Sequence, residues 1–169
     1  MRRKKIRRFQ GTTANFVNRL RNLRGQLKKL EMGLPEEVGK IVKGYETRIV
    51  EMIQIQLWNG KNGAEMGGMY GDIIRPFYKP STIRAKRRKG QPFDRVTLYD
   101  KGNFYRRMRV YYSKTEGLYI KSTDPKNDKL IKKYGPEIFR LDRANFNALI
   151  AIIRNELQKK VKQELLGRS

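Results

Sequence analysis

The sequence predicts an α+β fold, with long helices in the N-terminal half and at the C-terminus around a small antiparallel sheet and a long Gly/Pro-rich loop. Three patterns predict it: apolar residues at helical spacing near both ends, a hairpin-like alternation between them, and glycines and prolines across 59–92. With 169 residues, 38% of them hydrophobic, the chain can bury one modest core. We therefore divide it into a basic arm at 1–11, a basic amphipathic helix at 12–32, and a single α+β domain at 33–169 with its loop at 59–92.

A cationic helix is expected over 12–32, where Thr12 or Thr13 can cap the first turn. Its apolar residues recur at alternating spacings of four and three, which gives a narrow stripe: Phe16, Leu20, Leu23, Leu27 and Leu30. Such a stripe suits a short coiled-coil seam, a groove on a neighbouring subunit, or the chain's own core. The candidate interface residues on it are Phe16, Leu20, Leu23 and Leu27.

A second helix is expected after a break at Met32-Gly33. Pro35 followed by two glutamates is typical of a first helical turn, because proline lacks only an unused N–H there and acids favour the positive end of the helix dipole. An apolar face then continues to Trp58.

The last helix is expected to be capped by Asp142 and to end at Gly167, with apolar residues at helical spacing between them.

Glycines from Asn59 to Tyr70 are expected to prevent regular structure, and Arg75 to Ile83 is expected to be extended because two prolines restrict its backbone. The basic residues 84–89 would then project from the domain on a loop. A phosphate-binding loop at Gly67-Gly68 is disfavoured, because the sequence lacks the G-x-x-x-x-G-K-[ST] motif.

Period-two alternation predicts a short strand at 93–99 and a hairpin whose strands hold Met108 to Tyr112 and Leu118 to Ile120, with a turn around Thr115-Glu116-Gly117. A short helix is expected from Lys129 to Tyr134, before Gly135-Pro136.

The charge is strongly one-sided: 40 Lys and Arg against 16 Asp and Glu give a net charge of +24. Residues 1–30 hold eleven cations and no acid, and 73–93 hold seven cations and no acid. Repulsion of this size favours a polyanion or an acidic protein surface as partner over a merely solvated surface. The candidate binding residues are Arg2, Arg3, Lys4, Lys5, Arg7 and Arg8 in the arm, and Arg84, Lys86, Arg87, Arg88 and Lys89 in the second stretch.

The absence of His and Cys excludes imidazole and thiol chemistry, zinc fingers and disulfides. We expect no catalytic residue, metal or cofactor. No apolar run is long enough to span a bilayer and none resembles a signal peptide, so a membrane partner is not expected. Asp94, Asp100, Asp124 and Asp128 leave a metal-dependent nuclease as an alternative. It is disfavoured because Asp is common in turns for structural reasons.

Tyrosines are frequent around the expected hairpin: Tyr105, Tyr111, Tyr112 and Tyr119. They suit either a platform that stacks the bases of a single strand or a sheet face and subunit interface.

Two runs resemble structural proteins of tailed bacteriophages, especially crAss-like and related gut phages. The first joins Tyr78-Lys79-Pro80-Ser81-Thr82-Ile83 to Gly90-Gln91-Pro92-Phe93-Asp94-Arg95-Val96-Thr97-Leu98-Tyr99-Asp100-Lys101-Gly102-Asn103-Phe104-Tyr105. The second joins Ser122-Thr123-Asp124-Pro125-Lys126 to Leu130-Ile131-Lys132-Lys133-Tyr134-Gly135-Pro136-Glu137-Ile138-Phe139-Arg140-Leu141. Lys101 stands where those proteins have Thr. Tyr78, Phe104 and Tyr105, which lie in the first run, are further candidate interface residues.

The order of elements is also similar to the tail-completion and neck proteins that join phage heads to tails. This resemblance covers about 34–165. It implies a ring-forming structural protein, assembled into the virion in the bacterial host cytoplasm, whose partners are portal, neck or tail subunits or packaged DNA. The alternative is a nucleic-acid-binding protein as such, either genome-condensing or ribosome-associated.

Overall fold

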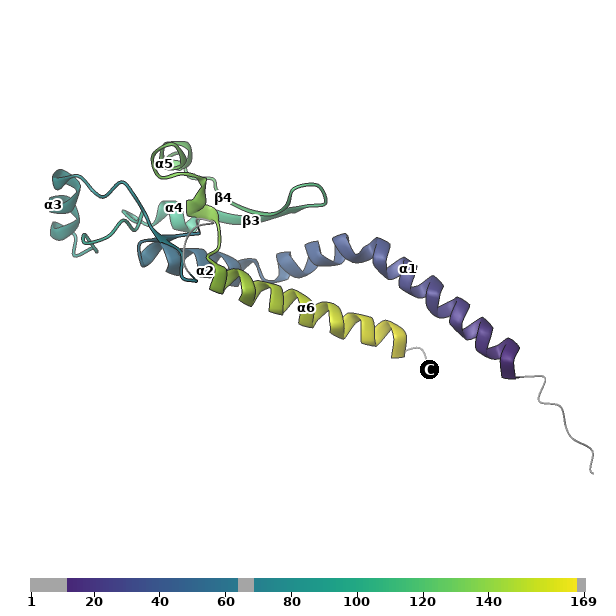
Figure 1. The fold of residues 1–169 in the computed structure, drawn as a ribbon. Coiled ribbons are helices and arrows are strands. Elements are labelled where there is room, and N and C mark those ends of the chain that lie inside the picture. The colour runs from purple at the N-terminus through teal and green to yellow at the C-terminus, as the bar shows by residue number, and fades with distance from the viewer. Residues whose placement is uncertain (1–11, 64–68, 167–169) are drawn as a thin grey trace, which may run out of the picture.

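A computed structural model describes residues 12–63 and 69–166 of the chain, and Figure 1 shows an elongated arrangement of helices around a hairpin. The fold is α+β, as the sequence predicts. The helices are α1 (Thr12–Gly44), α2 (Glu46–Trp58), α3 (Pro80–Arg88), α4 (Asn103–Arg106), α5 (Asn127–Tyr134), the 3-10 helix η1 (Pro136–Phe139) and α6 (Arg143–Leu166). The strands are β1 (Lys61–Asn62), β2 (Asp72–Ile73), β3 (Met108–Ser113) and β4 (Gly117–Ser122).

The expected break at Met32-Gly33 is wrong, because α1 runs through it with Pro35 inside the helix. An interior proline removes one backbone hydrogen bond, and α1 is visibly bent along its length (Figure 1). The chain instead breaks at Tyr45, between α1 and α2. Hydrogen bonds continue across this junction: Tyr45 N donates to Ile41 O, and Ile49 N donates to Tyr45 O, both at 3.0 Å.

The core forms around the buried face of α2. Ile49, Ile53 and Leu57 are fully buried there, at the helical spacing of four that places them on one side of the helix. They belong to one cluster with residues of the hairpin, η1 and α6, among them Met108, Ile138 and Leu149. In Figure 1 the hairpin lies above the α1–α2 junction and α6 lies below it.

The hairpin follows the sequence prediction. Strands β3 and β4 pair antiparallel from Met108 opposite Ser122 to Ser113 opposite Gly117. Strand β3 packs closely against α1, because a Cβ on Gly39 of α1 would lie only 2.8 Å from the ring of Tyr112. Helix α5 ends at Tyr134 as expected.

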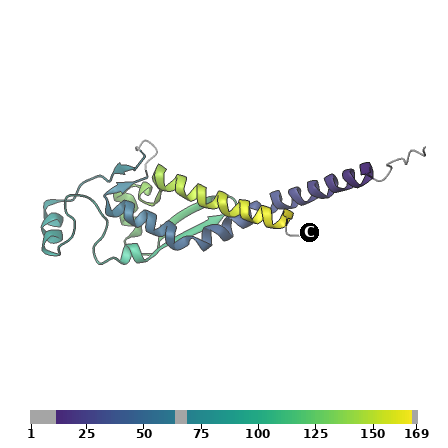
Figure 2. The ribbon, with the colours of Figure 1, turned by 90° about the horizontal axis from the view of Figure 1, so that it is seen from below.

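The final helix is also confirmed. The Asp142 carboxylate accepts the backbone N–H of Asn145 at 2.8 Å, which is a helix cap. Helix α6 then lies beside the second half of α1 (Figure 2), where Glu37 pairs with Lys160 and Tyr45 Oη donates to Glu156 at 3.2 Å.

The segment 59–92 is more ordered than a single loop. Strands β1 and β2 form a two-residue ribbon, with Lys61 opposite Ile73 and Asn62 opposite Asp72. A Cβ on Gly71 would lie 2.0 Å from the Asn62 carbonyl oxygen, so glycine lets the two strands approach. Gly67 and Gly68 lie outside the described residues.

The short strand expected at 93–99 does not form. Val96, Thr97 and Leu98 are buried consecutively, and Leu98 has a positive φ of 54°. A segment that is buried on all sides needs no polar face. The partial alternation of apolar and polar residues at 93–99 therefore does not indicate a strand.

Candidate functional site: the cationic surface at α3

The second basic stretch is a helix rather than the expected loop. Lys79 is extended, with ψ of 154°, and Pro80 occupies the first helical position, where its fixed φ suits a helix start. Helix α3 then places Arg84, Arg87 and Arg88 on one side at spacings of three and four. All three side chains are exposed. We call this set the α3 arginine face.

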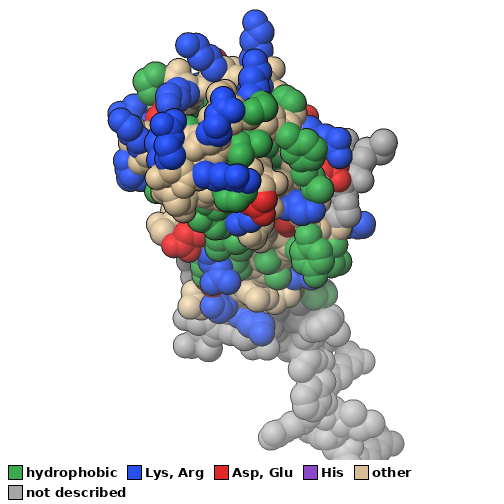
Figure 3. Space-filling view, turned by 90° about the vertical axis from the view of Figure 1, so that its left-hand side faces the viewer, with side chains coloured by type: hydrophobic (Ala, Val, Ile, Leu, Met, Phe, Trp, Pro, Cys, Tyr) green, Lys and Arg blue, Asp and Glu red, His purple; other side chains and the backbone are tan. Residues whose placement is uncertain are grey.

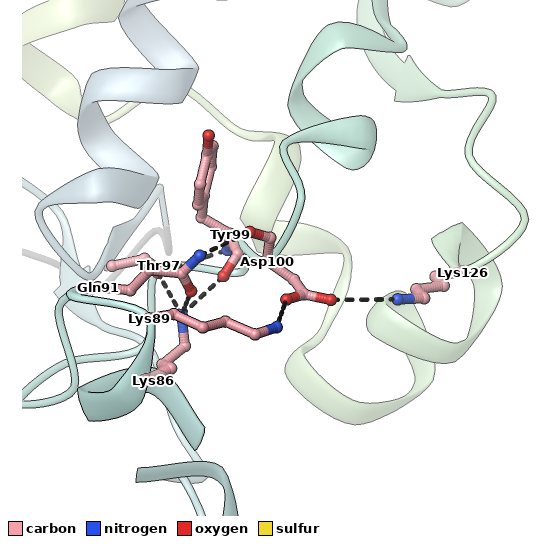
Figure 4. Close-up of polar contacts among 7 residues, drawn as sticks. All are labelled: Lys86, Lys89, Gln91, Thr97, Tyr99, Asp100 and Lys126. Atoms are coloured by element: carbon pink, nitrogen blue, oxygen red, sulfur yellow. Dashed lines mark hydrogen bonds and ion pairs between the residues drawn. The ribbon is translucent and has the colours of Figure 1, made fainter. Parts of the chain in front are cut away.

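Lys86, on the opposite side of α3, is only 6% exposed. Its ammonium donates to Tyr99 O at 2.6 Å, and to Thr97 Oγ1 and Gln91 Oε1 at 3.3 Å each (Figure 4). It also lies 4.9 Å from the centre of the Tyr78 ring. Lys86 therefore fixes α3 to the chain at 91–99, and its assignment as a partner-binding residue is corrected.

Thr97 connects this contact to the core. Tyr78 Oη accepts the backbone N–H groups of Thr97 at 2.9 Å and Leu98 at 3.2 Å, and Tyr105 Oη donates to Thr97 O at 2.5 Å. Burial raises the pKa of Tyr105 well above its ordinary value. These buried bonds stabilise the irregular segment that receives Lys86.

The expected interface role of Phe104 and Tyr105 is corrected by their burial, and that of Tyr78 is not tested. Phe104 and Tyr105 are 5% and 8% exposed and belong to the core. Tyr78 is half-buried and its hydroxyl is bonded inside the chain. Phe104 and Tyr105 are therefore core residues, whereas for Tyr78, which lines the cleft beside α3, the interface role stays a prediction.

A cleft of about 750 Å³ separates α3 from α4 and α5. Asp100 lies within it, between Lys89, which directly follows α3 and hydrogen-bonds to Asp100, and Lys126, which is 3.9 Å away (Figure 4). The hydrogen bond from Lys89 holds the pKa of Asp100 below its usual value. Lys89 is thus partly neutralised, in contrast to the α3 arginine face.

Two arginines at this end stack on aromatic rings. The guanidinium carbon of Arg87 lies 4.4 Å from the centre of the Phe93 ring, and that of Arg75 lies 5.0 Å from the centre of the Phe77 ring. The sequence prediction missed Arg75, Phe77 and Phe93 as site residues. The sequence could have indicated them, because all three lie in the acid-free stretch at 73–93, where cations and aromatic residues are close together. Figure 3 looks onto this end and shows Lys and Arg side chains gathered there.

The other predicted binding region is the start of α1. The arm residues Arg2, Arg3, Lys4, Lys5, Arg7 and Arg8 lie outside the described residues, as do the side chains of Phe16 and Leu27. Leu20 and Leu23 are described, and they are 50% and 46% exposed.

Residues 12–28 extend beyond the groove between α1 and α6 that Lys29 and Glu164 line, and both ribbon views show them projecting from the body (Figures 1 and 2). We call these residues the α1 extension.

The aspartates of the nuclease alternative do not gather. Asp94 pairs with Arg95 and Asp128 accepts from Asn127, while buried Asp124 accepts the backbone N–H of Lys126 at 2.8 Å. Across the described residues, no group of three or more acids, His or Cys is placed to hold a metal ion. None of the described helices is both long and apolar enough to cross a membrane.

The tyrosines divide between the two expectations. Tyr111 and Tyr119 stack on the hairpin with ring centres 5.2 Å apart and planes 12° apart, and both are exposed. Tyr105 is buried, and Tyr112 is half-buried against α1. The platform of four rings is therefore reduced to one stacked pair.

No protein-family model, curated protein or solved structure matches this chain.

Proposed function

We propose that this chain is a structural virion protein of a tailed phage, a ring-forming subunit of the head-to-tail connector, neck or tail-completion layer. The observation that carries the proposal is the α1 extension, which projects from the body with Leu20 and Leu23 about half exposed. Apolar side chains on a projecting helix lose the free energy that burial would supply, so the extension suits a groove on another subunit.

The charges beside the stripe indicate what kind of groove receives it. Arg21, Arg24 and Lys28 are exposed on the same helix, and no acid precedes Glu31. An apolar groove with an acidic rim complements this surface. A neighbour that is itself a ring, such as a portal or tail layer, presents this groove once per copy. This chain then forms a ring by following that symmetry.

The resemblance to neck and tail-completion proteins supplies the virion context. It supports a site of action in the particle, assembled in the bacterial host cytoplasm, with portal, neck or tail subunits as partners.

Two measurements test the proposal. Imaging of purified particles should locate the chain at the portal, neck or tail, and a location elsewhere would refute the assignment. In an assembly assay, Leu20→Ser with Leu23→Ser should abolish incorporation while the thermal unfolding of the isolated chain stays unchanged. The matched control is Ile55→Ser on α2, where the side chain is 62% exposed but lies on the body. Equal loss in both variants would contradict a specific role of the α1 extension.

A nucleic-acid-binding protein as such, genome-condensing or ribosome-associated, is the second candidate, and the α3 arginine face favours it. Such a protein would coat free DNA or RNA without assembling on other virion proteins. Recovery of the chain with host nucleoid or ribosomes, and its absence from purified particles, would support this candidate over the first.

A further inference from the structure

We infer that the two ends of the molecule have different partners, and that the α3 end contacts the phosphodiester backbone of duplex DNA while the α1 extension contacts protein. The inference deepens the proposed function and rests on it for the choice of DNA, the nucleic acid that a head-to-tail junction surrounds. The α3 end and the α1 extension are both strongly basic, so net charge alone does not distinguish them. The inference assigns a different partner to each.

The first argument is the type of cation at α3. The exposed cations of its outward side are arginines, and Arg84 and Arg88 make no ion pair within the part of the chain that the structure describes. A guanidinium presents parallel N–H groups that fit two phosphate oxygens at once, whereas an ammonium acts as a point charge. Arginines at spacings of three and four on one helix therefore form a row of phosphate-binding groups.

The second argument is preorganisation. Arg87 lies over Phe93 and Arg75 lies over Phe77, so the ring holds one face of each guanidinium while its N–H edge stays free. The helix that carries Arg87 is itself fixed by buried Lys86. A phosphate thus meets side chains that have already lost part of their conformational freedom, which lowers the entropic cost of binding.

The third argument is the difference in apolar exposure. Protein interfaces depend on buried apolar and aromatic groups at their centre. The α1 extension exposes Leu20 and Leu23, but α3 exposes no aliphatic side chain larger than proline, and Ile83 is half-buried. The rings near it, Phe77 and Phe93, are 53% and 39% exposed and each has a guanidinium over its face, so the apolar surface at this end is aromatic and paired with cations rather than aliphatic. The α3 end therefore suits a polyanion better than it suits an acidic protein surface.

The contact should be independent of base sequence. The exposed side chains available to phosphates are Arg75, Lys79, Arg84, Arg87 and Arg88, and Asn and Gln, which read adenine, are absent from α3. Five neutralised phosphates give a slope of log affinity against log salt of about −4.5. Between 50 and 200 mM salt, binding through this surface should weaken by a few hundred-fold, on the order of 10²–10³.

Fluorescence anisotropy with a labelled 30-base-pair duplex and the full chain tests the inference. Arg84→Ser with Arg87→Ser and Arg88→Ser should lower affinity at 50 mM salt by about 100-fold or more, and should make the salt slope shallower by nearly 3. The control removes the same charge from exposed lysines elsewhere: Lys114→Ser with Lys121→Ser and Lys132→Ser. Its affinity should stay within a few-fold of wild type. Equal losses in the two variants would show that only net charge matters and would overturn the inference.

A charge-conserving variant tests the bidentate geometry. Replacing the same three arginines by lysine keeps the net charge but removes the forked donors and the stacking of Arg87, so affinity should fall several-fold, on the order of 10-fold. Unchanged affinity would contradict recognition by the guanidinium row.

Competitors identify the ligand. Unlabelled duplex DNA should displace the labelled duplex at a lower concentration, counted in negative charges, than poly-glutamate or duplex RNA. Displacement by poly-glutamate at equal charge concentration would favour an acidic protein partner, and tighter binding of RNA would contradict the assignment to DNA.

Incorporation into particles separates the inference from the proposed function. The α3 serine variant keeps the α1 extension, so it should still enter particles although it binds DNA weakly. Loss of DNA binding with normal incorporation supports both proposals. Normal DNA affinity of the α3 variant overturns the inference alone. Failure of the wild-type chain to localise at the head-to-tail junction overturns the proposed function, and the choice of DNA over RNA then depends on the competition assay alone.

Discussion

The α1 extension and α3 share one sequence signature, a run of Lys and Arg without acids, yet the structure gives them different surroundings. The extension projects from the body with Leu20 and Leu23 exposed between its cations. Helix α3 is bound to the core through buried Lys86 and turns only its arginine face outward. The comparison teaches that a basic run does not define one kind of surface, because the environment of each residue decides whether its charge is structural or available.

The largest expected effect concerns the continuity of α1. Proline in a helix interior costs about 3 kcal/mol relative to alanine, whereas proline in a first turn costs nothing. Since α1 runs through Pro35, Pro35→Ala should raise the helical content. It should also raise the free energy of unfolding by up to about 3 kcal/mol. Circular dichroism and denaturant unfolding measure these quantities. A neutral or destabilising result would mean that the helix begins at Pro35, so that the extension is a separate unit.

The next effect concerns the attachment of α3. Lys86→Ala leaves the buried acceptors of Tyr99 and Thr97 without their donor. Loss of such bonds should lower the free energy of unfolding by about 1–3 kcal/mol. Arg88→Ser on the same helix is the control and should change it by no more than about 0.5 kcal/mol. If the two variants unfold alike in urea, α3 is not held by Lys86 and the contrast with α1 disappears.

A smaller effect concerns acid. The folded-state pKa of Asp100 is lowered by Lys89 below its ordinary value of 3.8. Its contribution to stability is therefore complete above about pH 3.8 and is lost as pH falls through the lower, folded-state pKa. Because the pair is solvent-exposed, Asp100→Asn should cost less than about 1 kcal/mol at neutral pH. Unfolding curves recorded from pH 6 to pH 3 should converge for variant and wild type. A constant difference at every pH would show that the charge of Asp100 is not responsible.

The smallest effect is expected in the α1 extension. Arg24→Ser with Lys28→Ser should change the free energy of unfolding by no more than about 0.5 kcal/mol, because both side chains are exposed on a projecting helix. Thermal unfolding at physiological salt checks this. A substantial loss would indicate that the extension packs on its own body, which is the third possibility that the sequence left open for the stripe.

The elements that could be predicted from the sequence have local signals. The hairpin has strand-forming residues on both sides of Gly117, and α6 has the Asp142 cap and a long apolar repeat. The elements that could not be predicted depend on distant partners. Helix α1 continues past Pro35 beside α6, where Glu37 meets Lys160, a contact over 123 positions of sequence. No local pattern contains that information.

The candidate site shows the same limit. The exposure of Arg84, Arg87 and Arg88 agrees with their selection, since consecutive long cations are mostly solvated. Lys86 was selected with them for the same reason, and only the oxygens of 91–99 make it different. The N-terminal signal of α3, Pro80 after an extended residue, is present in the sequence, but the two prolines at 76 and 80 predict an extended backbone just as well as a helix start.

The direction of α1 and α6 also decides how the molecule can be handled. The first described residue of α1 and the last of α6 both point away from α3 (Figures 1 and 2). A chain tethered to a sensor surface through its C-terminus would therefore hold α3 toward the solution and the α1 extension toward the support. DNA flowed over such a surface would have free access, whereas a protein partner of α1 would be hindered. A fusion placed after Leu166 should in the same way obstruct one partner and spare the other.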